Sequence, residues 1–138
     1  MPDRTFDDAI AALFNEYLDS WNRADLPAYA ACYTEPATLV LPTGPAVFPD
    51  HATIVAQLGD FRENLVRAGF DHTTIGPFSA TRCGENLAIA DLRELTRRRA
   101  DRSIMEATDM HYVLHRQDGA WRIAVAVACN TGWQDAHV

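Results

Sequence analysis

Residues 104–130, IMEATDMHYVLHRQDGAWRIAVAVACN, decide the fold because they predict two long strands joined by a tight turn. Asp118-Gly119 is the strongest hairpin signal in the chain, since both residue types tolerate the backbone of a two-residue turn. The strands are predicted over Ile104 to Arg116 and Trp121 to Asn130. This stretch therefore predicts an antiparallel sheet at the end of the chain.

The last of these strands separates small from large side chains. One face would carry Ala124, Ala126 and Ala128, and the other Ile123, Val125, Val127 and Cys129. Small residues that face inward would leave room for a ligand, while the larger set could form a dimer interface.

The turn determines which residues of the preceding strand share the alanine face, and the sequence leaves two registers open. A two-residue Asp118-Gly119 loop places Asp109 and His111 there. A type I turn with a glycine bulge adds one residue and places Thr108 and Tyr112 there instead, because side chains alternate with period two. We favour the first register and keep the second open.

Two further strands are predicted before this hairpin, over Asp71 to Cys83 and Asn86 to Arg98, which makes a meander of four. The only basic cluster, Arg97-Arg98-Arg99 with Arg102, would then lie at a hairpin tip. We expect these arginines to be solvated.

The first half of the chain predicts three helices and one strand. Apolar residues recur at steps of three and four from Phe6 to Trp21, which is the pattern of a helix with one buried face. Asp25 is a good N-cap for a short second helix that would include Tyr33, and Asp50 caps a third helix that ends at Gly69. Between them, Ala37 to Leu41 read as a strand. The whole order predicts a single α+β domain over residues 1–138.

The elements carry motifs that resemble the nuclear transport factor 2-like superfamily. These are W-N-x-x-D-L over residues 21–26, Tyr33, and D-G-x-W-R-I over residues 118–123. The resemblance spans nearly the whole chain and implies a cone-shaped, strongly bent antiparallel sheet wrapped around three N-terminal helices, the cystatin-like fold. The resemblance does not specify a function, because the superfamily holds enzymes, binding proteins and assembly domains alike. Within the superfamily, the chain is most similar to bacterial subfamilies of unassigned function.

The ketosteroid isomerases of that superfamily resemble this chain over Tyr17 to Gly44. Tyr17 falls on the isomerase's oxyanion-hole tyrosine. The isomerase's general base is an aspartate immediately before a proline, and the residue at that place here is Leu41, which cannot accept a proton. The resemblance therefore implies a pocket without the isomerase's central group.

A mostly apolar pocket between the sheet and the helices is expected to hold a small apolar molecule. Its expected lining residues are Phe14, Trp21, Tyr33, Leu41, Tyr112, Ala126 and Ala128. Tyr17, Asp109 and His111 are the candidate catalytic residues, with Tyr17 as donor and one of the other two as base. The first hypothesis is a binding protein without catalysis. The alternative is a cofactor-free isomerase, dehydratase or cyclase that acts on a polyketide- or terpenoid-like substrate.

Charge and composition limit the classes of partner that we expect for this chain. The net charge of −7 disfavours nucleic acid and anionic membranes, which repel a chain of that sign. Asp50-His51 and Asp71-His72 do not supply the three or four converging ligands of a metal site, and we expect neither metal nor cofactor. Three unpaired cysteines and the absence of a visible signal peptide predict a cytoplasmic protein. A homodimer that packs sheet on sheet is expected.

Overall fold

The computed structural model describes residues 4–130 as three helices and seven strands. The helices are α1 (Arg4–Asn22), α2 (Leu26–Ala30) and α3 (His51–Arg67). The strands are β1 (Tyr33–Leu41), β2 (Gly44–Phe48), β3 (Phe70–Thr74), β4 (Phe78–Arg82), β5 (Leu87–Arg99), β6 (Ile104–Gln117) and β7 (Ala120–Asn130). This order confirms the α+β class.

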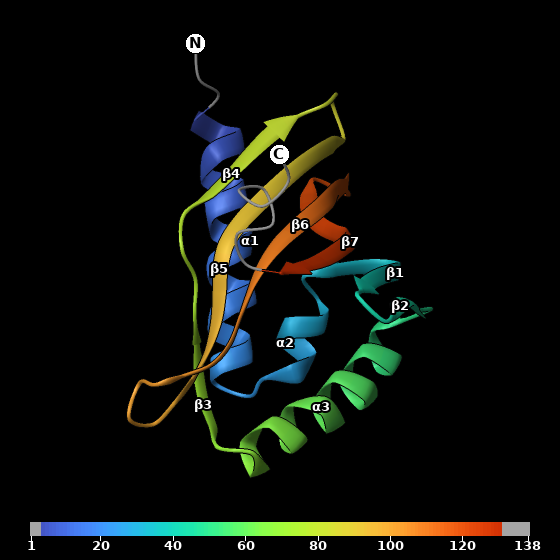
Figure 1. Cartoon of the computed structure of the whole chain (residues 1–138). Coiled ribbons are helices and arrows are strands. Elements are labelled where there is room, and N and C mark those ends of the chain that lie inside the picture. Colours follow the sequence, from blue (N-terminus) through green and yellow to red (C-terminus); the bar gives the residue numbers. More distant parts are fainter. Residues whose placement is uncertain (1–3, 131–138) are drawn as a thin grey trace.

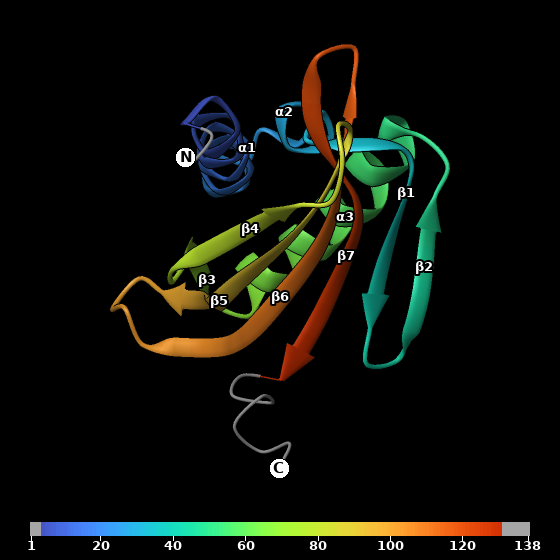
Figure 2. The same cartoon turned by 90° about the horizontal axis from the view of Figure 1, so that it is seen from above.

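All the strands belong to one sheet with the order β2-β1-β7-β6-β5-β3, and β4 also pairs with β5. The strand pairs are antiparallel except that of β1 with β7, which is parallel. Figure 2 shows the sheet bending from β3 and β4 at one edge to β1 and β2 at the other. In Figure 1, α1 runs beside β4 and β5, and α2 and α3 lie below β1. The helices therefore cover the concave side of a curved sheet.

The predicted caps hold two of the helices in place. The Asp25 side chain accepts a hydrogen bond from the Ala28 backbone N–H at 3.1 Å, and Asp50 accepts one from that of Thr53 at 2.8 Å. Each carboxylate satisfies a backbone donor that the first helical turn leaves free. Gly69 follows α3 with φ +108°, a conformation that favours glycine. Both caps and the end of α3 were predictable because they are local.

Three boundaries differ from those predicted. Tyr33 begins β1 and is not helical, because Ile123 of β7 donates its N–H to the Cys32 carbonyl and draws the chain into the sheet. Gly44–Phe48, for which no strand was predicted, forms a strand against β1. The segment predicted as one strand from Asp71 is divided into β3 and β4 by a turn at Gly76, whose N–H donates to the Arg93 carbonyl.

The Asp118-Gly119 hairpin has the predicted two-residue loop, with φ +52° and +79° and Gln117 paired with Ala120. The side chains nevertheless face as in the second register, in which Thr108 and Tyr112 share the alanine face. Leu114 pairs with Ile123, but the next pair is Val113 with Val125, so Ala124 is an extra residue in β7. This bulge reverses the face relationship for the rest of the ladder, because side chains alternate with period two.

The inner face beyond the bulge carries Tyr112 beside Ala126 and Met110 beside Ala128. The prediction that Asp109 and His111 share the alanine face is therefore wrong, since they alternate with Met110 and Tyr112 and pair with Cys129 and Val127 instead of alanines. Ile123, expected outside, is fully buried in the core. In the described residues, no helix is both long and apolar enough to cross a membrane.

Candidate functional site

A cavity of about 720 Å³ lies between the helices and the concave face of the sheet. Ligand pockets in proteins commonly have volumes of roughly 300–1,000 Å³ and mostly apolar walls. Its walls come from α1, α2, α3 and strands β1, β2, β3, β5, β6 and β7. Exposed lining residues mark the mouth: Leu41, Pro42, Thr43, Gln57, Phe61, Glu106 and Asn130.

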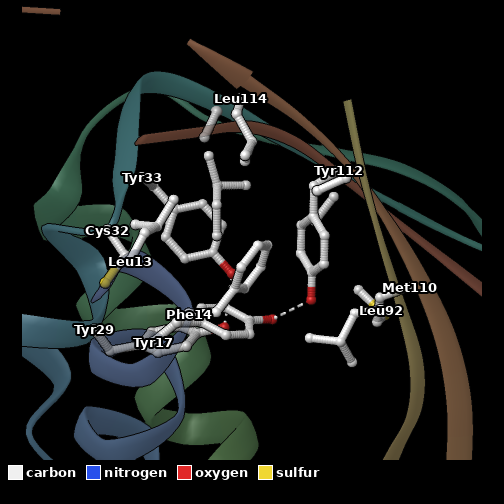
Figure 3. Packing of buried hydrophobic residues seen from close by; sticks show 14 of the residues in the cluster. Leu13, Phe14, Tyr17, Tyr29, Cys32, Tyr33, Leu92, Met110, Tyr112 and Leu114 are labelled. Atoms are coloured by element: carbon white, nitrogen blue, oxygen red, sulfur yellow. Dashed lines mark hydrogen bonds between the residues drawn. The ribbon is translucent and has the colours of Figure 1, made fainter. Parts of the chain in front are cut away.

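Four tyrosines meet at the closed end of this cavity. Tyr17 comes from α1, Tyr29 from α2, Tyr33 from β1 and Tyr112 from β6, and each is at most 7% exposed. Figure 3 shows their rings converging, with the hydroxyl of Tyr112 directed at that of Tyr17. Tyr17 stacks on Tyr29 with ring centroids 5.3 Å apart and packs edge-on against Tyr112. We call these four residues the tyrosine cluster.

The hydroxyls of the tyrosine cluster bond to one another. Tyr112 donates to Tyr17 over 3.2 Å, and the Tyr29 and Tyr33 hydroxyls lie 2.7 Å apart. Burial raises the pKa of Tyr29, Tyr33 and Tyr112 well above the ordinary value of 10.0. These three side chains are therefore neutral hydroxyl groups at physiological pH.

The cluster has two hydrogens more than its internal bonds use. Four hydroxyls carry four hydrogens, one each, and the two hydrogen bonds use two of them. Because Tyr112 donates to Tyr17, one remaining hydrogen belongs to Tyr17 and the other to Tyr29 or Tyr33. All three of these residues line the cavity, whereas Tyr112 does not. The cluster can therefore donate a hydrogen bond to a molecule inside.

The expected ligand-binding residues fall into two groups. Trp21, Tyr33, Leu41 and Ala128 line the cavity, as does Tyr17. Phe14, Tyr112 and Ala126 lie behind its wall, each at most 1% exposed. Phe14 packs against Tyr17 and Tyr112 with centroids 6.1 and 5.0 Å away, so it supports the tyrosine cluster from the core side.

Asp109 lies apart from the cavity, inside a bulge of β5. Leu92 pairs with Met110 but Leu95 pairs with Thr108, so β5 has one extra residue at this point, where Glu94 adopts φ +53°. The Asp109 carboxylate accepts the Glu94 N–H at 3.0 Å and approaches Arg93 at 3.5 Å. At 1% exposure it fills the bulge. Asp109 therefore stabilises the β5 bulge and does not contact Tyr17.

His111 also lies on the outer face, where its Nδ1 is 2.6 Å from Asp91 of the neighbouring strand. The expected Asp109–His111–Tyr17 arrangement is therefore not formed. Among the described residues that line the cavity, Glu106 at the mouth is the only carboxylate and histidine is absent. The alternative function requires a base beside Tyr17. Among the described residues that line the cavity, no such base lies there.

Sequence reasoning missed the polar wall opposite α3. Arg97, expected in a solvated tip, lines the cavity together with Thr73. The β5 bulge explains the error, since its extra residue puts Arg97 and Leu95 on the same face as Leu92, which precedes the bulge. A bulge that is filled by an aspartate from the next strand has no local signal in β5 itself. Within residues 4–130, no three His, Cys, Asp or Glu side chains converge as a metal site would require.

Known proteins resemble the chain in sequence pattern and in fold. Residues 7–131 match the family described as NTF2-like protein (DUF6841). No curated protein matches the chain by sequence. An NTF2-like protein with a cystatin-like fold from Novosphingobium aromaticivorans has 18% identity and a TM-score of 0.76, over 91% of this chain and 82% of that one.

Two further solved structures have the same fold. A protein of unknown function from Mycobacterium tuberculosis has 21% identity and a TM-score of 0.70, over 88% of this chain and 69% of that one. A Catenulispora acidiphila protein, solved in complex with S-DNPA, has 16% identity and a TM-score of 0.75, over 98% of this chain and the whole of that one. At these identities the likeness establishes the fold and leaves the ligand of this chain open.

Proposed function

This chain belongs to the NTF2-like protein family (DUF6841), and we propose that it binds a small, mostly apolar molecule with an oxygen acceptor inside the cavity. The single observation that carries the proposal is that the hydrogen bonds within the tyrosine cluster leave two hydroxyl hydrogens unused. A buried donor without an acceptor costs free energy, and a ligand carbonyl oxygen would remove that cost. The ligand-bound Catenulispora acidiphila structure is a related precedent.

The apolar walls account for the rest of the proposed ligand. Trp21, Leu39, Leu58, Leu95 and Met110 line the cavity between the tyrosine cluster and the mouth. Burial of apolar ligand surface against such walls contributes roughly 25 cal/mol per Å². The walls would therefore supply affinity, and the tyrosine hydroxyls would orient the ligand.

Binding is favoured over catalysis because of what surrounds Tyr17. Leu41 cannot accept a proton, and Asp109 and His111 lie on the outer side of the sheet. A proton abstraction needs a base within about 2.6–3.2 Å of the proton that it removes. The cavity supplies a hydrogen-bond donor, which is sufficient to hold a ketone.

A matched pair of fluorescent probes tests the proposal. 2-Acetylnaphthalene carries a carbonyl, and 2-ethylnaphthalene has nearly the same shape without an acceptor. We expect the ketone to bind the protein more tightly, by about 2- to 10-fold for one hydrogen bond. Removal of a lining hydroxyl in Tyr17→Phe, Tyr29→Phe or Tyr33→Phe should reduce this preference.

Tyr112→Phe is the matched control, because it removes a hydroxyl of the same cluster that does not line the cavity. It should leave the preference for the ketone nearly unchanged. If the wild-type protein binds neither probe, or binds both equally, the proposal is wrong.

We also infer that two copies pair through the outer face of the sheet. On this face Leu87 and Ile89 of β5 are 42% and 50% exposed, and Ile89 lies beside Val113 of β6. An exposed apolar patch on a strand pair is a common dimer surface. Sedimentation velocity should show a dimer that Ile89→Asp converts to a monomer, and a monomeric wild type would contradict the inference.

A cytoplasmic location is the third inference. Cys32, Cys83 and Cys129 all have free thiols, as is usual in a reducing compartment. Cell fractionation of the source organism would test it, and recovery in an extracellular fraction would contradict it.

A further inference from the structure

Two buried polar atoms on the wall of the cavity have no hydrogen-bond partner among the described residues. They are Nε of Arg97 and Oγ1 of Thr73, and both residues line the cavity. Thr73 is 4% exposed. Most buried side-chain donors and acceptors in proteins are paired, so two orphaned atoms on one wall require an explanation.

The two residues are direct neighbours on one face of the sheet. Thr73 of β3 pairs with Arg97 of β5, and side chains of paired residues in an antiparallel ladder lie about 4.5–5.5 Å apart at Cβ. The β5 bulge turns Arg97 inward. Asn22 of α1 fixes β3 at Thr73. Its side-chain oxygen accepts the Thr73 N–H at 2.8 Å, and its NH2 donates to the Thr73 carbonyl at 2.9 Å. The pair is therefore positioned by three separate elements.

The other contacts of Arg97 do not involve its Nε, which has no partner among the described residues. Its Nη1 forms an ion pair with Glu106, the partner of Arg97 in β6. Its guanidinium lies 5.1 Å from the centre of the Phe61 ring of α3, which favours a cation over the ring face. Arg97 lines the same cavity as three tyrosines of the tyrosine cluster, so a single ligand can reach both sites.

We propose that Arg97 and Thr73 form a binding site for a ligand carboxylate, at a place in the cavity distinct from the tyrosine cluster. A carboxylate offers two acceptor oxygens, which match a guanidinium N–H and a neighbouring hydroxyl donor. This inference rests on the proposed function, and it adds that the ligand is an acid with a second oxygen acceptor on its apolar body. The tyrosine cluster would hold that second acceptor.

A ligand carboxylate would explain why a partly buried arginine lies beside an unpaired threonine hydroxyl. In the free protein the two atoms have no partner among the described residues, and the carboxylate would supply one. Sites that bind polar ligands often reduce the stability of the free protein, because their polar groups await a partner. The same pair is therefore expected to cost stability in the free protein and to add affinity in the complex.

The test compares acids with the neutral ketone. The probes are 2-acetylnaphthalene, 6-acetyl-2-naphthoate and 6-acetyl-2-naphthylacetate, where the two acids differ by one methylene in the reach of the carboxylate. We expect at least one acid to bind the wild-type protein about tenfold more tightly than the ketone, since charge-assisted hydrogen bonds are stronger than neutral ones.

Two variants locate the effect. Thr73→Val keeps the shape and removes the hydroxyl, and Arg97→Met keeps much of the length and removes the guanidinium. Each should reduce the preference for the acid severalfold and leave the affinity for 2-acetylnaphthalene nearly unchanged. Arg98→Met is the charge-matched control, because Arg98 bonds Thr74 and the Arg102 carbonyl and does not line the cavity.

The free protein provides a second measurement that does not depend on any ligand. Thr73→Val should raise Tm by a few degrees, because it removes a buried hydroxyl that has no partner. A loss of Tm in this variant would mean that the hydroxyl is already satisfied, and it would contradict the proposal.

Different results would contradict the carboxylate site and the proposed function. If the acids bind no more tightly than the ketone, or if Arg97→Met and Arg98→Met lower the preference equally, the carboxylate site is wrong. In that case the binding of 2-acetylnaphthalene and its sensitivity to Tyr33→Phe would still support the proposed function. If no probe binds at all, the proposed function fails first.

Discussion

The two faces of strand β6 differ in how their polar groups are satisfied. On the inner face, the Tyr112 hydroxyl bonds Tyr17 in a fully buried cluster of neutral groups. On the outer face, His111 pairs with an Asp91 carboxylate whose side chain is 47% exposed. Inner-face groups depend on one another, because water cannot replace a lost partner there. Outer-face groups exchange partners with solvent at little cost.

Asp109 differs from the other polar groups of the outer face. It projects from the outer face of β6, yet it is as buried as Tyr112, because the bulge of β5 folds around its carboxylate. The cost of a substitution should therefore follow burial and pairing, and not the face alone. Four predictions test this ordering.

The largest effect is expected at Phe14, which is completely buried against Tyr17, Tyr112 and Phe78. Phe14→Ala should lower the free energy of unfolding by about 3–5 kcal/mol, since it leaves a cavity in the core. Urea denaturation measures the change, with the milder Phe14→Leu as a second variant if the first does not fold. Ile89→Ala on the outer face should cost about 1 kcal/mol or less within a single subunit, because Ile89 is half exposed there. Any additional cost should depend on protein concentration, as expected if Ile89 lies in the proposed dimer interface.

Asp109→Asn should have the next largest effect. The substitution removes the charge that faces Arg93 and replaces one of the two acceptor oxygens, which contact Arg93 and the Glu94 N–H, by an NH2 donor. We expect a loss of about 1–3 kcal/mol in the free energy of unfolding. Equal stability of the variant and the wild type would mean that the β5 bulge does not depend on this carboxylate.

Alkaline pH should destabilise the protein through the tyrosine cluster. Burial raises the pKa of Tyr29, Tyr33 and Tyr112 in the folded state, so below pH about 10 both states are protonated and stability is complete. As pH rises above about 10, the unfolded tyrosines ionise and the folded ones do not. The free energy of unfolding should then fall by about 1.4 kcal/mol per pH unit for each such tyrosine.

Denaturation at several pH values, with absorbance of the phenolate, would measure this fall. A Tyr29→Phe, Tyr33→Phe double variant should show a shallower slope above pH 10. Phenolate absorbance from all four tyrosines of the folded protein near pH 10 would contradict the buried cluster.

The smallest effect is expected at the Asp91–His111 pair. Asp91→Asn should cost only about 0.2–1 kcal/mol at neutral pH, as for other exposed ion pairs. Added salt should reduce the difference between variant and wild type further. A cost as large as that of Asp109→Asn would break the proposed ordering, and it would indicate that this part of the outer face is covered in solution.

Local signals in the sequence determined much of the fold. The α1 periodicity, the caps Asp25 and Asp50, and the Asp118-Gly119 turn act over a few residues, and each one is present in the structure. The family resemblance supplied the bent sheet. Tyr17 was identified through both its place in the helix pattern and the isomerase comparison, and it lines the cavity.

Tertiary structure alone decided which residues face the cavity. One extra residue at Ala124 in β7 and one in β5 near Glu94 reverse the alternation of their strands. The first places Asp109 and His111 outside, and the second brings Arg97 inside beside Thr73. Because strand faces repeat every two residues, a single unpaired residue changes every side chain beyond it. The position of such a bulge depends on how the neighbouring strands pack. It therefore cannot be predicted from the residues of one strand alone.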